Sequence, residues 1–167
     1  PDYLMVPEEA LEQVIEKATK IVGDMYPKIL DTKDYTAMVN DRHYQRISAT
    51  LADAEKRAIR TVTINPADED FTKNPSQKIA PTLIINPDDE AMCMQDEIFG
   101  PILPIKTYKN FEETISYINN RPRPLAAYFF GKDKAEEERF LTGTTSGGVS
   151  INDVMFHMLQ KDLPFGG

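Results

Sequence analysis

The sequence predicts an α/β fold with a mainly parallel sheet and helices on both of its faces. The first observation behind this prediction is an alternation along the chain, in which short apolar runs typical of strands are followed by longer amphipathic segments. The second is the composition, because 41% of the 167 residues are hydrophobic and 28% are charged. A chain of this length and composition can bury a core, and we expect a single domain over residues 1–167.

The predicted strands are short and mostly apolar. The run that starts at Ile79 is expected to end at Asn86-Pro87, and the last strand follows the pair Gly147-Gly148. The segments predicted to form strands are residues 3–6, 60–64, 79–85, 102–108, 126–130 and 149–151.

The predicted helices are marked by apolar residues at helical spacing and by capping residues. The strongest begins at Pro7, a favourable first helical residue, and continues to Met25. Asn110 is expected to cap a helix in which Glu113 occupies the acidic position of a capping box. The other helices are predicted for residues 41–54, 111–119 and 132–141, and residues 66–77 form a predicted surface loop.

The charge and the cysteine content exclude several classes of function. The net charge of −8 repels phosphate backbones, so we expect no nucleic-acid partner. A single cysteine excludes an intramolecular disulfide and favours a reducing, cytoplasmic location. No apolar stretch is long enough to cross a bilayer, so we expect no membrane partner.

The two ends of the sequence suggest a piece of a longer protein. The chain opens on Pro1-Asp2-Tyr3 with neither an initiator Met nor a signal-peptide pattern. It closes at Gly166-Gly167, inside a glycine turn. We therefore expect a domain that is truncated at both ends.

The segment from Gln95 to Ile105 contains the most informative candidate site. Glu97 and Phe99 stand directly before the turn Gly100-Pro101, which leads into a predicted strand. Such a rigid bend is a common place for binding residues. Taken singly, Glu97 could be a solvated charge and Phe99 a core residue.

The other candidates have plain structural explanations. Cys93 could be a thiol nucleophile, but Asp96 and Glu97 are close in sequence and would disfavour its thiolate, so we interpret it as non-catalytic. His43 is expected to be structural or on the surface. His157 follows the last predicted strand and either faces a substrate or is a hydrogen-bonded loop residue.

Two further kinds of site are not predicted. Neither histidine has a Cys or His partner at metal-ligand spacing, so we expect no metal. The glycine-rich residues 142–148 precede a predicted strand, whereas a phosphate-binding loop follows a strand and opens a helix. We interpret this segment as a helix stop and a turn.

Several motifs in order resemble the class-three branch of the aldehyde dehydrogenases, which includes the coniferyl aldehyde dehydrogenases. Residues 97–101, Glu-Ile-Phe-Gly-Pro, are similar to the Glu-x-Phe-Gly-Pro signature of that superfamily. Residues 1–3 resemble the segment just after its catalytic cysteine. The remaining similar segments are residues 40–44, 79–83, 94–105, 124–130, 146–149, 152–154 and 163–167.

The resemblance implies the fold of the Rossmann-like catalytic domain of these enzymes and an NAD or NADP cofactor. In the family, a cysteine thiolate attacks the aldehyde, hydride passes to the cofactor, and a glutamate-activated water hydrolyses the thioester. The family cysteine is expected about three residues before Pro1, and the general base, the oxyanion asparagine and the cofactor domain lie further upstream. The chain therefore contains no expected catalytic residue and should be inactive by itself.

What the resemblance assigns to this chain is half of a site. Glu97 would bind the ribose hydroxyls of the cofactor, and Phe99 would pack near the nicotinamide. The resemblance implies an aromatic aldehyde as substrate. The expected residues of the pocket wall beside it are Asn152, Val154, Phe156 and His157. The implied partners are the small-molecule aldehyde, the upstream cofactor domain and a second copy in a homodimer.

Three alternatives remain open from the sequence. The chain could be a thiol enzyme that uses Cys93, or a non-catalytic oligomerisation module. It could also come from an acyl-phosphate reductase with the same superfold, although residues 97–101 and 164–167 are closer to the aldehyde-oxidising branch.

Overall fold

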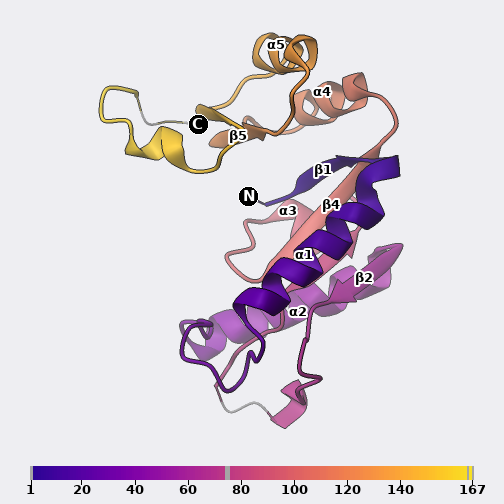
Figure 1. Cartoon of the computed structure of the whole chain (residues 1–167), viewed down its shortest axis with the longest axis vertical. Coiled ribbons are helices and arrows are strands. Elements are labelled where there is room, and N and C mark those ends of the chain that lie inside the picture. Colours follow the sequence, from indigo (N-terminus) through magenta and orange to yellow (C-terminus); the bar gives the residue numbers. More distant parts are fainter. Residues whose placement is uncertain (1, 74–75, 165, 167) are drawn as a thin grey trace. The chain divides into compact units, whose positions relative to one another are not determined.

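The computed structural model describes residues 2–73, 76–164 and 166, which form two compact units, residues 1–107 and 108–167. The elements of the first unit are β1 (Leu4–Pro7), α1 (Leu11–Met25), α2 (Asp41–Arg57), β2 (Arg60–Thr63), β3 (Thr82–Ile85), α3 (Met92–Gln95) and β4 (Ile102–Tyr108), whose last residue belongs to the second unit (Figure 1).

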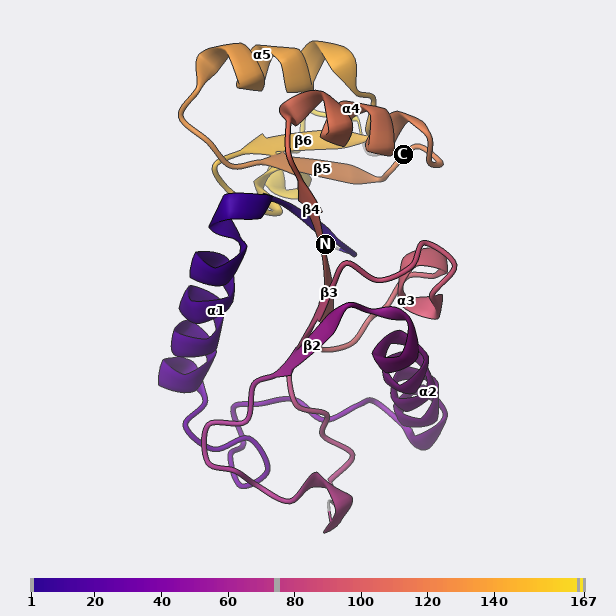
Figure 2. The same cartoon turned by 90° about the vertical axis from the view of Figure 1, so that its right-hand side faces the viewer.

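The sheet of the first unit has the strand order β1-β4-β3-β2. Strands β3 and β4 are parallel, with Leu83 opposite Leu103, and β2 is an antiparallel edge strand, with Val62 opposite Leu83. Helix α1 covers one face of this sheet and α2 covers the other (Figure 2). The predicted α/β class, with parallel pairing and helices on both faces, is confirmed.

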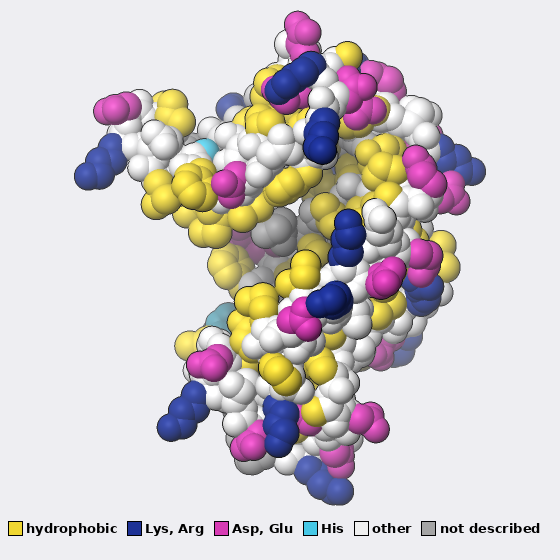
Figure 3. Space-filling model, viewed as in Figure 1, with side chains coloured by type: hydrophobic (Ala, Val, Ile, Leu, Met, Phe, Trp, Pro, Cys, Tyr) yellow, Lys and Arg dark blue, Asp and Glu magenta, His cyan; other side chains and the backbone are white. Residues whose placement is uncertain are grey.

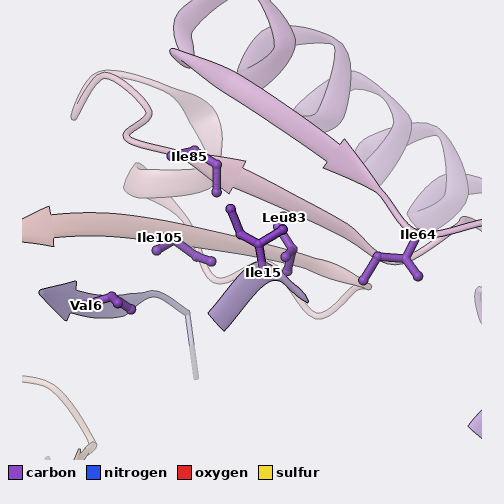
Figure 4. Packing of buried hydrophobic residues seen from close by; sticks show 6 residues of the cluster. All are labelled: Val6, Ile15, Ile64, Leu83, Ile85 and Ile105. Atoms are coloured by element: carbon purple, nitrogen blue, oxygen red, sulfur yellow. The ribbon is translucent and has the colours of Figure 1, made fainter. Parts of the chain in front are cut away.

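The α1 side of the sheet contains a core of aliphatic side chains. Ile15 of α1 is 8% exposed and packs over Leu83 and Ile105, which are 5% and 0% exposed (Figure 4). Successive strand residues point to opposite faces, so Ile84, between Leu83 and Ile85, points to the α2 side. The buried residues of this cluster are Val6, Ile15, Ile64, Leu83, Ile85 and Ile105.

The second unit contains α4 (Phe111–Asn119), β5 (Ala126–Phe129), α5 (Lys134–Gly143), β6 (Gly148–Ile151) and a 3₁₀ turn, η3 (Phe156–Leu159). Strands β5 and β6 are parallel, with Ala126 opposite Gly148 and Phe129 opposite Ile151. Ring contacts connect the core of this unit, because Phe129 lies 6.0 Å from Phe111 and 5.7 Å from Phe140 between ring centroids. The face of the two strands that carries Phe129 is therefore the one packed against the helices.

The structure corrects several predicted boundaries. Pro7 ends β1 instead of opening a helix, and a 3₁₀ turn, η1 (Glu8–Ala10), precedes α1. Strand β3 begins at Thr82 rather than Ile79, because Pro81 has no N–H to donate to a ladder. Helix α5 begins two residues late because the Asp133 carboxylate caps it, accepting from the N–H groups of Ala135 and Glu136.

Other corrections concern short turns and one cap. The predicted loop at residues 66–77 contains a 3₁₀ turn, η2 (Phe71–Lys73), and α3 and η3 were not predicted at all. Asn110 caps α4 as expected, since its side chain accepts from the Glu113 N–H. The Glu113 carboxylate, however, accepts from the N–H of Lys109 and the side chain of Asn110, so the box closes one residue earlier than usual.

The surface carries both signs of charge. Figure 3 shows acidic and basic side chains interspersed over the face in view. No helix among the described residues is long and apolar enough to span a bilayer.

Candidate functional site

The bend between α3 and β4 presents Glu97 and Phe99 to solvent. Both residues are exposed, Phe99 to 78%, whereas Ile98 between them is only 3% exposed. The Ile98 side chain is buried in the protein and fixes the bend, whereas the side chains of Glu97 and Phe99 point toward solvent. Phe99 has a φ of 46°, a left-handed backbone conformation that is strained for a bulky residue and is common at functional sites.

Hydrogen bonds from distant residues hold the backbone of this bend. The Arg46 guanidinium of α2 donates from Nη2 to the Ile98 carbonyl at 2.7 Å and from Nη1 to the Glu97 carbonyl at 3.3 Å. The Ile98 N–H donates to the Asp2 carboxylate at 3.3 Å. The backbone of Ile98 is thus restrained at both its N–H and its carbonyl.

Close packing fixes the end of the bend. A Cβ atom added at Gly100 would lie 2.8 Å from Cδ1 of Ile47, so only glycine fits against α2 without a shift. The next carbonyl, that of Pro101, accepts the Thr82 N–H at 2.9 Å and joins the bend to β3. The predicted Gly-Pro turn is therefore a turn set by helix and sheet contacts together.

Glu97 and Phe99 line a hollow of about 360 Å³ beside α2. His43, Arg46 and Thr50 of α2 form one wall, because a spacing of three and four residues places them on one helix face. A second hollow, of about 570 Å³, is also lined by His43 and Phe99, together with Tyr26 and Tyr35. Phe99 is thus shared between the two hollows.

Sequence reasoning missed the contribution of α2 to this site. His43 was expected to be structural or on the surface, and it does lie on the helix surface, but it lines both hollows with Phe99. The helical spacing of His43, Arg46 and Thr50 was visible in the sequence. Their position opposite Glu97 depends on a contact across about 50 residues of chain, and no local pattern reveals it.

Tyr26 and Tyr35 in the second hollow are held firmly. Their rings are in edge-to-face contact with centroids 5.1 Å apart, and the Tyr35 hydroxyl donates to the Ile79 carbonyl at 2.7 Å. Burial, followed by the nearby Tyr26, raises the pKa of Tyr35 above its ordinary range. The Tyr35 hydroxyl therefore serves as a neutral structural donor.

The segment containing this aromatic pair is clamped by two opposite charges. The Glu69 carboxylate accepts from the N–H groups of Ile29 and Leu30, at 2.6 Å and 3.0 Å. The Lys78 side chain is 7% exposed and donates to the carbonyls of Ile29, Leu30 and Thr32. A buried lysine is costly unless it is paired in this way, so Lys78 has a structural role in forming this wall.

The predicted substrate residues belong to the second unit. His157 does not remain at the carboxyl end of β6, because η3 turns it back over the sheet face. Its Nδ1 lies 3.1 Å from Ser150 Oγ, and its ring centroid lies 5.8 Å from that of Tyr128. A Cβ at Gly148 would lie 2.5 Å from the imidazole Cδ2, so Gly148 provides the space for the ring.

Asn152 uses its side chain to connect two loops. Its Oδ1 accepts the Gly131 N–H at 2.9 Å, and its Nδ2 donates to the Gly131 carbonyl at 3.0 Å. Asn152 has a φ of 55°, which asparagine tolerates better than most residues. This amide therefore holds the segment after β5 against the segment after β6.

The other two predicted pocket residues are open to solvent. Val154 is 42% exposed and Phe156 is 56% exposed. A hollow of about 370 Å³ in the second unit is lined by His157, Gly148, Met158 and Leu163 among others. His157 is therefore the one of the four predicted residues that lines this hollow.

Cys93 has the properties of a buried structural thiol. It is 2% exposed, and burial raises its pKa, with a smaller contribution from the Asp53 charge. The carboxylate that contributes to the raised pKa is therefore Asp53 of α2, and not Asp96 or Glu97, which were expected to act because they are close to Cys93 in sequence. Asp53 Oδ2 also accepts the Met92 N–H at 2.9 Å, at the start of α3. These observations argue against a thiol enzyme that uses Cys93.

No group of three or more His, Cys, Asp or Glu side chains in the described part of the chain is arranged to hold a metal ion. The arrangement around Glu97 instead combines an exposed carboxylate, an exposed aromatic ring and a helix wall formed by His43, Arg46 and Thr50. Such a set can bind a polar ligand that carries hydroxyl groups beside a flat ring.

Comparisons with known proteins agree with the motifs. The aldehyde dehydrogenase family model matches residues 3–167. A coniferyl aldehyde dehydrogenase of Pseudomonas sp. is 48% identical over 167 residues, covering all of this chain and 35% of that protein. A rat enzyme named aldehyde dehydrogenase, dimeric NADP-preferring, is 36% identical over 168 residues, again covering all of this chain and 35% of that protein.

The fold agrees as well. A substrate-bound structure of AldH from Staphylococcus aureus superposes with a TM-score of 0.84 at 34% identity, covering all of this chain and 35% of that one. The chain thus spans about a third of the length of the relatives it matches. With a family model that matches nearly every residue and a fold shared over the whole chain, this chain belongs to the aldehyde dehydrogenase family.

Proposed function

We propose that this chain is part of an NAD(P)-dependent aldehyde dehydrogenase that oxidises an aldehyde to a carboxylic acid. The observation that carries the proposal is the bend that presents Glu97 and Phe99 together at a hollow of about 360 Å³. Because the chain covers about 35% of its Pseudomonas relative, the activity is proposed for a longer polypeptide. Both units would together form most of its catalytic domain.

The residues of the bend fit the cofactor that the family implies. The exposed Glu97 carboxylate can accept hydrogen bonds from two neighbouring ribose hydroxyls, and a charged acceptor strengthens both. The exposed Phe99 ring can cover the apolar side of the nicotinamide ribose region. The cofactor, when bound, accepts the hydride from the substrate. The residues of this chain would bind and orient the cofactor.

The second unit would supply part of the substrate wall. Val154, Phe156 and His157 would face the aldehyde, and Asn152 would position them through its two bonds to Gly131. An aromatic, coniferaldehyde-like substrate is supported by the 48% identity to the named coniferyl aldehyde dehydrogenase. The cofactor would be NAD or NADP, and the enzyme a cytoplasmic homodimer.

The chain alone would be inactive. Its single thiol, Cys93, is buried and has a raised pKa, so it does not supply a nucleophile. The nucleophile, the general base and the oxyanion asparagine are proposed to lie outside these 167 residues.

The test is an assay of NADH and NADPH formation with coniferaldehyde, benzaldehyde and a medium-chain aliphatic aldehyde. It compares the full-length protein, its Glu97→Gln variant and the chain alone. Glu97→Gln keeps the shape but removes the charge, so cofactor affinity should fall roughly tenfold or more. Glu55→Gln, on the exposed side of α2, is the matched control and should leave affinity unchanged.

Two results would contradict this proposal. Turnover by the chain alone would mean that Cys93 or another group in these residues can act as the nucleophile. Unchanged cofactor affinity in Glu97→Gln would mean that this carboxylate does not bind the ribose. The aldehyde with the highest kcat/KM would identify the substrate class.

A second candidate function, a non-catalytic oligomerisation module, is supported by one observation. Large apolar side chains are exposed around η3, namely Val154, Met155, Phe156, Met158, Leu159 and Leu163. Exposed apolar side chains gathered in this way often mark a protein contact. Light scattering over a range of concentrations tests this function, and a monomer throughout would argue against it.

A further inference from the structure

We propose that Arg46 is a positioning residue that holds the bend carrying Glu97 and Phe99 in its binding conformation. The inference rests on the proposed function of these two residues, and it adds the part of the protein that orients them. Arg46 lies on α2, 51 and 52 residues before the two carbonyls that it contacts.

The geometry of the contact favours arginine. The guanidinium donates to two successive carbonyls, with Nη1 at 3.3 Å from Glu97 O and Nη2 at 2.7 Å from Ile98 O. A planar fork with fixed N–H directions can satisfy both acceptors at once, whereas a lysine ammonium is a compact charge on a flexible stem. The contact therefore constrains the path of the chain on either side of Ile98.

The bend needs such a constraint because the side chain of Phe99 does not stabilise the backbone conformation of this residue. Its φ is 46°, and its ring is 78% exposed, so packing of the ring contributes little to keeping this backbone conformation. A bulky residue keeps a left-handed conformation only where its surroundings over-determine it. The restraint must then come from the residues on either side of Phe99.

Helix α2 supplies that restraint through two successive residues. Arg46 holds the carbonyls before Phe99, and Ile47 packs against Gly100 directly after it. The guanidinium is itself placed by a well-packed helix, since Ile47 is fully buried and the Thr50 hydroxyl donates to the Arg46 carbonyl at 3.0 Å. The Asp2 carboxylate adds a further restraint by accepting a hydrogen bond from the Ile98 N–H.

Arg46 also lines the hollow with Glu97, so a direct contact with a cofactor phosphate is the competing role. The two roles differ in what they predict. A positioning residue changes the dynamics of the bend without cofactor, and it affects NAD and NADP to the same extent. A phosphate ligand leaves the free bend unchanged.

The experiment uses the full-length protein with Arg46→Met, Arg46→Lys and the control Arg42→Met, an exposed arginine one turn earlier on α2. Hydrogen exchange of the peptide covering residues 97–102 is measured by mass spectrometry without cofactor. Dissociation constants for NAD and NADP are measured separately by fluorescence, and far-UV circular dichroism checks the fold.

The expected result for Arg46→Met is at least tenfold faster exchange in residues 97–102, with equal weakening of NAD and NADP binding. Arg46→Lys should recover only part of the protection, and Arg42→Met should match the unsubstituted protein. Unchanged exchange in Arg46→Met would overturn the proposal, and so would a loss of affinity confined to NADP.

Failure of the proposed function would look different. If Glu97→Gln leaves cofactor affinity unchanged, the ribose-binding role of Glu97 is wrong. Faster exchange of the bend in Arg46→Met would still support the positioning role, because that readout contains no cofactor.

Discussion

Gly100 lies so close to Ile47 that a Cβ atom built on the glycine would be 2.8 Å from the isoleucine Cδ1. This contact brings the bend that carries Glu97 and Phe99 directly against helix α2. Because Ile47 is fully buried, its side chain has little room to move away.

The Gly100→Ala substitution should therefore destabilise the protein. Forcing a methyl group into packed surroundings costs about 1–3 kcal/mol, measured as the free energy of unfolding in urea. Gly23→Ala on α1 is the matched control. Its Cβ would lie 3.6 Å from the Pro66 ring, an ordinary contact, and alanine in a helix should stabilise by roughly 0.5–1 kcal/mol. Effects of the same sign in both variants would contradict this packing argument.

Replacing Asn152 should separate its two structural tasks. Asn152→Gly keeps the left-handed backbone accessible but loses both bonds to Gly131, which should cost about 1 kcal/mol because the site is exposed. Asn152→Ala loses the same bonds and also strains the backbone at a φ of 55°, so its cost should be larger by about 1 kcal/mol. Urea unfolding of both variants measures the order, and alanine equal to glycine would rule out a backbone contribution.

Asp53 should make stability depend on pH in the acid range. Hydrogen bonds from the Met92 N–H and from Arg57 hold its pKa below the ordinary value. A carboxylate whose pKa is lower in the folded state stabilises the fold above about pH 4, and this contribution is lost as the pH falls through the lowered pKa.

Asp53→Asn should thus lower the free energy of unfolding at pH 7, and the difference from the unsubstituted protein should shrink below about pH 4. Denaturant unfolding at several pH values measures this difference. Asp31→Asn serves as a control, because the Asp31 side chain is 83% exposed and lies 4.0 Å from Lys28. A difference that stays constant from pH 7 to pH 2 would show that the Asp53 charge has no part in it.

Cys93 should react slowly with iodoacetamide at neutral pH. Its 2% exposure and its raised pKa both reduce the amount of accessible thiolate. We expect labelling at least a hundredfold faster in denaturant than in the native protein, with glutathione as the reference thiol. Rapid labelling of the native protein would revive the thiol-enzyme alternative.

Lys78→Met should loosen the segment around Ile29 and Leu30. The substitution keeps an apolar stem but leaves the carbonyls of Ile29, Leu30 and Thr32 without the donor that Lys78 provides. A buried carbonyl that loses its hydrogen-bond donor lowers the free energy of unfolding by about 1–3 kcal/mol at most. Hydrogen exchange of residues 26–36 should rise in the variant, and Lys73→Met on the exposed turn η2 should leave it unchanged.

The sequence by itself determined the features that depend on neighbouring residues. The amphipathic spacing of α1, the cap of α4 by Asn110, and the Gly-Pro turn before β4 were all predicted and are present. These signals depend on side chains three or four positions apart, so they are readable without a fold. Several motifs in order, among them residues 97–101, likewise resembled the family to which the chain belongs.

Tertiary structure alone decided how those parts meet. Helix α3 is fastened by Asp53, 39 residues before Met92, and the bend is held by Arg46 and Asp2, 52 and 96 residues from Ile98. The side-chain amide of Asn152 forms hydrogen bonds with the backbone of Gly131, and η3 places the His157 ring beside Gly148. Such contacts join residues far apart in the chain, and their energy exists only after the helices and sheets have packed, so no local pattern encodes them.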